Sequence, residues 1–165
     1  MKRTTIVTVV LAVLAVSLAG CGGSSDKSTV SAEAQRDADL YAIDQIERTW
    51  HKASSTHDID LMMTLWAPDA TATFGTSTLT GTDEIRGFFK KAGPFQPGHH
   101  WASETPAYRI RTTVNGDKGT LYFECVYVDV KTGKVASVVG ADQKVQKIDG
   151  KWLITNAVGA SPKLG

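Results

Sequence analysis

Hydrophobic and polar positions follow three different patterns along this chain of 165 residues. Residues 6–19 form a nearly continuous apolar run, residues 32–56 carry an apolar side chain at every third or fourth position, and the positions after Pro97 alternate with a period of two. Spacings of three and four indicate an amphipathic helix, whereas a period of two indicates strands. We therefore expect helices in the first half of the domain and strands in the second.

Three helices are expected before Pro97. The first spans about 32–56, and its apolar face is made by Leu40, Ile43, Ile46, Trp50 and Ala53. Asp58 is expected to cap a short second helix, and a short strand follows at 71–74. Thr82 is expected to cap the third helix, which ends at Gly93-Pro94.

Long strands are expected after Pro97, at 100–114, 120–130, 135–148 and 151–158. These segments are rich in Val, Ile, Thr, Tyr and Trp, which favour strands. The pairs Asn115-Gly116, Thr132-Gly133 and Asp149-Gly150 separate them, and Asn-Gly and Asp-Gly are typical of tight hairpins. An antiparallel meander follows, and the helices must cover one of its faces, which predicts an α+β fold.

The N-terminal apolar run follows Lys2 and Arg3 and is shorter than the ~20 residues that a helix needs to cross a bilayer. Such a run is typical of a secretory signal. Leu18-Ala19-Gly20-Cys21 resembles the bacterial lipobox, in which the cysteine is acylated and becomes the new amino terminus. The alternative is an ordinary signal peptide with a chance cysteine. We expect acylated Cys21 to anchor the protein to a membrane of a bacterial cell envelope, on the extracytoplasmic side.

These features divide the chain into four parts. Residues 1–20 are the expected signal peptide, residues 21–31 the lipidated cysteine with a flexible Gly/Ser tether, residues 32–160 one folded domain, and residues 161–165 a C-terminal tail.

Charge and cysteine content exclude two classes of protein. Without Lys2 and Arg3 the mature chain has 16 Lys and Arg against 17 Asp and Glu, so no basic surplus is available for nucleic acid. Cys125 is the sole cysteine left once Cys21 is acylated, so no internal disulfide can form. On its strand we expect Cys125 to be a small buried hydrophobe and Glu124 to face outside.

Three segments of the domain carry a family resemblance. The run "THDIDLMMTLWAPDATATF", the run "LTGTDEIRGFF" and the end "VQKIDGKWLI" resemble the SnoaL-like polyketide cyclase branch of the nuclear transport factor 2-like superfamily. The resemblance covers about residues 38–158. It implies a cone of three helices on a curved, mostly antiparallel sheet, a cystatin-like fold, with an apolar cavity at the open end and frequent dimerisation through the sheet.

The catalytic carboxylates of that superfamily carry over only in part. A ketosteroid isomerase would have a general base near the end of the first strand, where this chain has Thr73-Phe74-Gly75-Thr76, so that mechanism is not expected. SnoaL-type cyclases use an acidic residue on the penultimate strand, which makes Asp142 a candidate. Strict alternation turns Gln143 into the cavity and Asp142 outward, and a bulge would reverse this.

Two adjacent histidines, His99 and His100, open the second expected strand. Neighbouring strand residues point to opposite faces, so at most one of them enters the cavity. We take His100 as the candidate, either as a general base or as a polar contact for a ligand. The alternative is a histidine at the sheet margin, bonded to backbone or water.

The expected pocket residues are mainly apolar and aromatic: Trp50, Met62, Trp66, Phe74, Phe89, His100, Phe123 and Gln143. The same aromatic residues could instead fill the core. Adjacent histidines cannot converge on one ion, so no metal is indicated, and no cofactor is indicated either.

The sequence favours an exported lipoprotein that binds a small hydrophobic molecule or a partner without catalysis, because the surest catalytic positions hold Gly75 and Gln143. Two alternatives remain open. One is an acid/base enzyme, a cyclase, isomerase or dehydratase, that uses His100 or Asp142 on a hydrophobic substrate. The other is a homodimerisation module that associates through its sheet.

Overall fold

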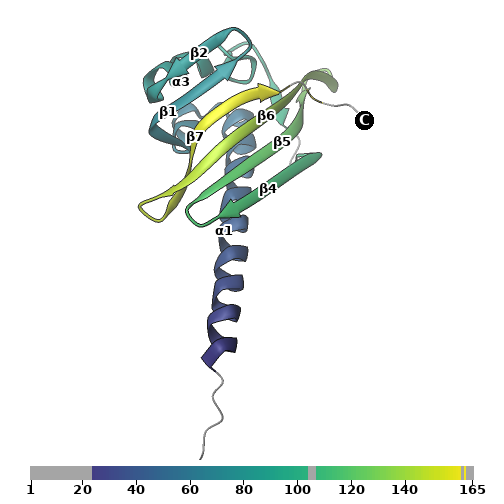
Figure 1. Ribbon diagram of the computed structural model, residues 1–165. Helices are drawn as coiled ribbons and strands as arrows, with labels where there is room; N and C mark the ends of the chain where they lie inside the picture. The colour runs from purple at the N-terminus through teal and green to yellow at the C-terminus, as the bar shows by residue number, and fades with distance from the viewer. Residues whose placement is uncertain (1–23, 104–106, 161, 163–165) are drawn as a thin grey trace, which may run out of the picture.

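A computed structural model describes residues 24–103, 107–160 and 162 of the chain. Its spine is the long helix α1 (Ser24–Ser55), which lies against one face of a curved sheet and projects far beyond it (Figure 1). The short helices α2 (Ile59–Met63) and α3 (Gly81–Phe89) and the 3-10 turn η1 (Gly93–Phe95) lie at the other end of the domain. No helix in the described part is long and apolar enough to cross a membrane.

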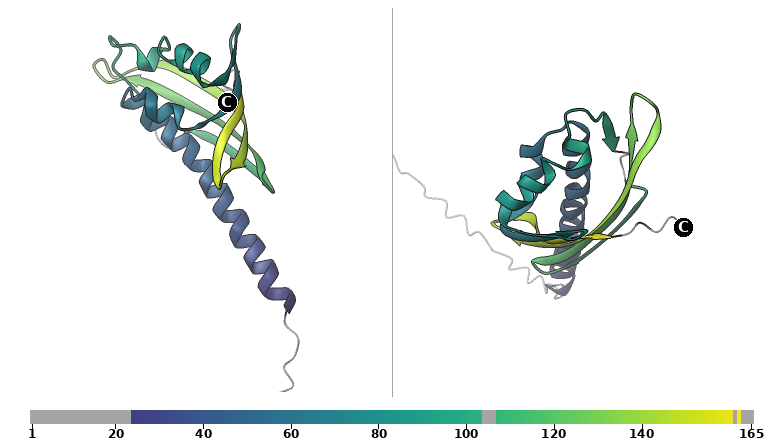
Figure 2. Two further views of the ribbon diagram at one scale, coloured as in Figure 1. Left: turned by 90° about the vertical axis from the view of Figure 1, so that its left-hand side faces the viewer. Right: turned by 90° about the horizontal axis from the view of Figure 1, so that it is seen from above.

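The sheet contains seven strands: β1 (Trp66–Phe74), β2 (Ser77–Thr80), β3 (Trp101–Ser103), β4 (Arg109–Asn115), β5 (Lys118–Asp129), β6 (Lys134–Ile148) and β7 (Lys151–Ala160). Their order is β2-β1-β7-β6-β5-β3, and β4 also pairs with β5. All pairs are antiparallel except β1 with β7. Figure 2 shows the sheet curling around the helices, so the predicted α+β fold with a curved, mostly antiparallel sheet is confirmed.

The predicted hairpins are present because their turn residues accept positive φ. Asp149 and Gly150 have φ values of 49° and 78°, and Gly116 has a φ of 60°. These turns join β6 to β7 and β4 to β5. Asp58 caps α2 as predicted, because its carboxylate accepts a hydrogen bond of 2.8 Å from the Leu61 N–H.

Three element predictions need correction. The segment 100–114 is not one strand but two, β3 and β4, each paired with β5. The N-cap residue of α3 is Thr80, not Thr82, because the helix begins at Gly81; its side chain makes no capping hydrogen bond, but its N–H donates a hydrogen bond of 2.7 Å to the Glu84 carboxylate. The helix α1 begins at Ser24, so residues 24–31 belong to a helix and not to a flexible tether. The expected signal peptide, Cys21 and most of the tail at 161–165 lie outside the described residues.

The core lies between α1 and the concave face of the sheet. Ile43, Ile46, Trp50 and Ala53 of α1 are buried there, as their spacing predicts. At the end where α1 leaves the sheet, the Asp39 carboxylate accepts hydrogen bonds from Lys147 Nζ (2.7 Å) and Trp152 Nε1 (3.0 Å). These bonds, that from Lys147 first, lower the pKa of Asp39 to about 2.

Glu124 corrects a further expectation. Its neighbours Phe123 and Cys125 are buried on the concave side, so Glu124 belongs to the convex face, as alternation predicts. Its side chain is nevertheless fully buried. The hydroxyl of Tyr108 donates a hydrogen bond of 2.5 Å to the carboxylate, Tyr122 donates another, and Arg109 lies 3.3 Å away. A tyrosine and an arginine that precede or begin β4 thus cover a charge that the sequence pattern assigns to solvent.

Candidate functional site

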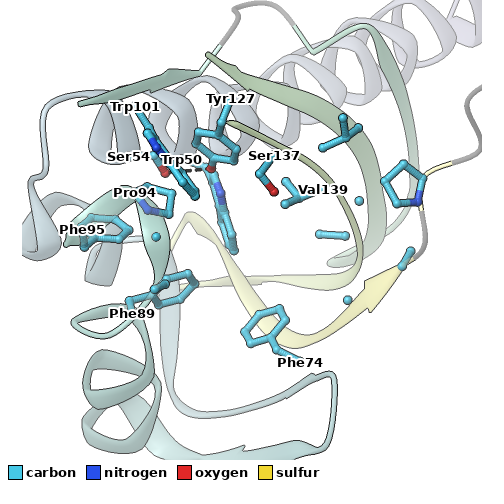
Figure 3. Close-up of a pocket in the computed structure, with 18 of the residues that line it drawn as sticks. Trp50, Ser54, Phe74, Phe89, Pro94, Phe95, Trp101, Tyr127, Ser137 and Val139 are labelled. Atoms are coloured by element: carbon cyan, nitrogen blue, oxygen red, sulfur yellow. Dashed lines mark hydrogen bonds between the residues drawn. The ribbon is translucent and has the colours of Figure 1, made fainter. Parts of the chain in front are cut away.

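A pocket of about 640 Å³ lies at the end of the domain that holds α3 and η1. It is bounded by the last turns of α1, by α3 and η1, and by the ends of β1, β6 and β7 (Figure 3). Its volume falls in the range typical of small-molecule sites.

The aromatic side of the pocket comes from the helices and from β1. The ring of Trp50 meets that of Phe89 edge-on, with centroids 5.2 Å apart, and Phe74 stacks on Phe88 at 5.0 Å. Phe95 contacts Phe89 at 5.8 Å. Each ring therefore fixes its neighbour, so this wall is preformed.

The opposite side of the pocket is made by the start of β6 and the end of β7 (Figure 3). Much of this wall consists of small residues, Gly140 and Ala141 on β6 and Gly159 and Ala160 on β7. At Gly140 a Cβ atom would lie only 2.9 Å from the backbone oxygen of Ala160, so close strand pairing requires glycine there. The small side chains keep the space in front of the aromatic wall open.

The polar side-chain groups of the described lining residues are the hydroxyls of Ser54, Tyr127 and Ser137 and the indole N–H groups of Trp50 and Trp101. Tyr127 donates a hydrogen bond of 3.1 Å to Ser54 Oγ, and Ser137 is the cross-strand partner of Tyr127 on β6 (Figure 3). Burial raises the pKa of Tyr127 far above its ordinary value. Among the described lining residues none is Asp, Glu, His, Lys or Arg. Near neutral pH the lining is therefore uncharged.

Some of the predicted pocket residues line this site and others do not. Trp50, Phe74, Phe89 and Phe123 line it. Met62 and Trp66 are buried in the core and are absent from the described lining. The ring of Trp66 packs behind Trp50, with centroids 6.0 Å apart, so it supports the wall without reaching the pocket.

His100 does not line the pocket, contrary to expectation. Trp101, the next residue, enters instead, and adjacent strand residues point to opposite faces. His99 stacks on Trp101 at 4.6 Å and its Nδ1 lies 2.9 Å from the carbonyl oxygen of Gly93. The backbone oxygen of His100 accepts a hydrogen bond from Val130. The pair thus occupies the sheet margin, which was the alternative reading.

The penultimate strand follows strict alternation at Asp142 and Gln143. Asp142 is exposed, whereas Ala141 and Gln143 are buried on the other face. Ala141 lines the pocket but Gln143 does not, because it lies one step further into the core. The Gln143 side-chain amide has no hydrogen-bond partner among the described residues. Neither Asp142 nor Gln143 therefore touches the pocket.

Sequence reasoning missed a buried acid on α1. Glu47 was placed between the apolar positions of the helix, yet it is fully buried beside His51, whose Nδ1 lies 3.2 Å from Oε1 of Glu47. The same oxygen accepts a hydrogen bond of 2.8 Å from the Ala107 N–H, and burial raises the pKa of Glu47. The i, i+4 spacing of Glu47 and His51 beside the apolar stripe was the available signal. The pair holds Ala107 on the helix and does not line the pocket.

The described residues offer neither a reactive thiol nor a metal-binding cluster. Cys125 is buried and free, as expected, and burial raises the pKa of its thiol to about 12. Within residues 24–103 and 107–160, no three His, Cys, Asp or Glu side chains are grouped so that they could hold a metal ion.

Comparison with known families identifies the class of protein. The SnoaL-like domain family matches residues 47–153, so the chain belongs to that family. No curated protein matches the chain.

Solved structures agree on the fold. A nuclear transport factor 2-like protein with a cystatin-like fold from Novosphingobium aromaticivorans is 17% identical with a TM-score of 0.71, over 87% of this chain and 94% of that one. One of unknown function from Pseudomonas putida is 14% identical with a TM-score of 0.66, over 76% and 88%. A candidate dehydratase of the same superfamily from Streptomyces avermitilis is 15% identical with a TM-score of 0.62, over 78% and 99%.

Proposed function

We propose that this SnoaL-like protein is exported and lipid-anchored, and that its pocket binds a small, uncharged, hydrophobic molecule without catalysis. The observation that carries the proposal is the lining: aromatic rings face small side chains, and the polar side-chain groups are uncharged, namely the hydroxyls of Ser54, Tyr127 and Ser137 and the indole N–H groups of Trp50 and Trp101. The anchor is proposed from the lipobox at Leu18 to Cys21.

The lining selects against charged ligands. A charged group that enters the pocket loses its hydration and meets no opposite charge among the described lining residues, which costs several kcal/mol. A neutral ligand avoids this cost and gains contact with Trp50, Phe89 and Trp101. The Tyr127 and Ser54 hydroxyls replace His100 and Gln143 as the groups that would orient it.

The same lining argues against acid/base catalysis. A general acid or base works best with a pKa near the operating pH. The titratable side chain in the described lining is Tyr127, whose pKa burial raises far above that range. The exposed Asp142 and the buried Glu47 stand outside the lining. Binding is therefore favoured over the cyclase, isomerase or dehydratase alternative.

Two fluorescent probes test the selectivity. N-phenyl-1-naphthylamine is neutral, and 8-anilino-1-naphthalenesulfonate is nearly the same molecule with a sulfonate. We expect the chain without residues 1–20, carrying Cys21→Ser, to bind the neutral probe at least about tenfold more tightly. Equal affinity for both probes, or tighter binding of the sulfonate, would contradict an uncharged pocket.

A pair of variants locates the binding. Ser137→Phe should fill the pocket and weaken binding of the neutral probe by at least about tenfold. Val158→Phe adds the same ring at an exposed position outside the lining and should leave the affinity unchanged. Thermal unfolding of both variants checks that they remain folded. If Ser137→Phe is folded and binds like the parent, the probe site is elsewhere.

A further inference from the structure

The helix α1 has two parts: residues 24–38 project beyond the sheet and are called the bare half here, and residues 39–55 pack against the sheet. The pocket lies at the end of the packed part. We propose that the bare half is a rigid stalk that holds the pocket at the end of the molecule farthest from the membrane, so that the ligand arrives from the aqueous compartment and not from the bilayer. This inference rests on the proposed anchor at Cys21 and on the proposed binding function.

The bare half of α1 stands clear of the domain. Residues 31–38 are all exposed, and Asp39 is the first buried residue in the part of α1 from residue 31 to residue 55. Both views show this half extending away from the sheet (Figures 1 and 2). At 1.5 Å per residue, the segment from Ser24 to Asp39 is about 22 Å long. Only Gly22 and Gly23 separate its start from Cys21.

The stalk is continuous with a helix that the core holds in place. No Gly or Pro occurs between Ser24 and Ser55, so nothing in the sequence of α1 favours a kink. Where the helix enters the domain, Asp39 is bonded to Lys147 and Trp152 of the β6–β7 hairpin. Gln35, one turn earlier, donates a hydrogen bond of 3.1 Å to the same carboxylate. The bonds to Lys147 and Trp152 therefore fix α1 to the hairpin at this junction, and the bond from Gln35 lies within the helix.

The pocket lies at the opposite end of the same helix. Trp50 and Ser54, which line it, belong to the last turns of α1. Trp50 is about 39 Å from Ser24 along the helix axis at 1.5 Å per residue. The β4–β5 and β6–β7 turns lie toward the stalk, whereas the β5–β6 turn lies toward the far end (Figure 1).

The composition of the stalk opposes lying flat on a membrane. A helix that lies in the interface carries large apolar residues such as Leu, Phe or Trp along one face. Residues 24–38 contain no such residue, and their charged residues are Asp26, Lys27, Glu33, Arg36 and Asp37. Attached through acyl chains at Cys21, this segment is suited to stand in water above the lipid.

Energy transfer to the membrane surface measures the height of the domain. The full lipidated chain is placed in phosphatidylcholine vesicles that contain a lipid with a rhodamine headgroup. A donor dye is attached at Thr132→Cys in the far turn, or at Asp117→Cys in the near turn. Buried Cys125, with its raised pKa, and acylated Cys21 leave the introduced cysteine as the reactive one. We expect clearly weaker transfer from residue 132 than from residue 117.

Changes in the stalk provide the decisive comparison. Deletion of residues 26–36 removes about three helical turns and should bring both dyes closer to the lipid by about 16 Å, with the order of the two positions kept. Ala34→Pro breaks the helix and should bring the two positions to similar transfer. Ala34→Ser keeps the helix and should match the parent.

The outcomes separate this inference from the proposed function. Equal transfer from the two positions in the parent, or no change after the deletion, would overturn the stalk. A chain that does not stay on the vesicles would overturn the anchor and with it the stalk. Failure of the unanchored chain to bind N-phenyl-1-naphthylamine, with the distances as expected, would overturn the pocket function and leave the geometry intact.

Discussion

At the scale of single residues, Glu124 shows how a charge can be buried on a convex sheet face. Its carboxylate receives the hydroxyls of Tyr108 and Tyr122 and lies near Arg109. Charged hydrogen bonds of this kind offset the loss of hydration. The residues that bury Glu124 lie largely at the start of β4, about fifteen positions earlier in the chain. The alternation within β5 therefore does not reveal that Glu124 is buried.

Because Tyr108 is hydrogen-bonded to Glu124, the ionisation of its phenol reports whether this contact is formed. The hydrogen bond to Glu124, followed by desolvation, raises the pKa of Tyr108 to about 12. A raised phenol pKa stabilises the fold below the ordinary value of 10, and that stability is lost as the pH rises from 10 through 12. We expect Glu124→Gln to lower this pKa toward 10, measured by phenolate absorbance. Tyr108→Phe identifies the step in the titration, and an unchanged step in Glu124→Gln would contradict the assignment.

At the scale of elements, turn and cap chemistry made the fold predictable. Asp149-Gly150 and Asn115-Gly116 place the hairpins, and Asp58 places α2, because each depends on local backbone geometry alone. The split between β3 and β4 was not predictable from the local pattern, and between them the Ala107 N–H is bonded to Glu47 of α1, a residue 60 positions away. A local pattern does not encode contacts of that range.

The site was predictable in its apolar part and not in its polar part. Trp50, Phe74, Phe89 and Phe123 line the pocket because hydrophobic periodicity places them inside the cone. The polar groups expected to orient a ligand were wrong: Trp101 lines the pocket in place of its neighbour His100, and Gln143 is buried in the core outside the described lining. Tyr127 and Ser54 come from different elements, and their pairing appears only once α1 lies against β5.

The packing and hydrogen bond of Trp152 against α1 are expected to contribute to the free energy of unfolding. Trp152 is buried and donates its indole N–H to Asp39. Trp152→Ala should lower the free energy of unfolding by about 3–5 kcal/mol through lost burial and a cavity. Trp152→Phe keeps most of the packing and should cost about 1–3 kcal/mol by removing the donor. Urea denaturation measures both, and an unchanged midpoint and slope in Trp152→Ala would contradict this packing.

At the scale of the whole molecule, one helix links three parts of the proposed function. Its start follows the proposed lipobox, its middle is fixed to the β6–β7 hairpin through Asp39, and its end supplies Trp50 and Ser54 to the pocket. Because α1 is one continuous helix with a rise of 1.5 Å per residue, the proposed anchor at Cys21 would set the distance between the membrane and the proposed binding pocket.

The anchor itself is tested at Cys21. We expect Cys21→Ser to block acylation and to leave the precursor uncut by the lipoprotein peptidase, because the cysteine thiol is the group that receives the lipid. In the parent, we expect two or three acyl chains to hold the protein in the detergent phase, since each buried methylene contributes ~0.8 kcal/mol. Ser25→Ala, four positions later, should mature and partition like the parent. Normal maturation of Cys21→Ser, with partition into the detergent phase, would show that acylated Cys21 is not the anchor and would contradict the lipobox.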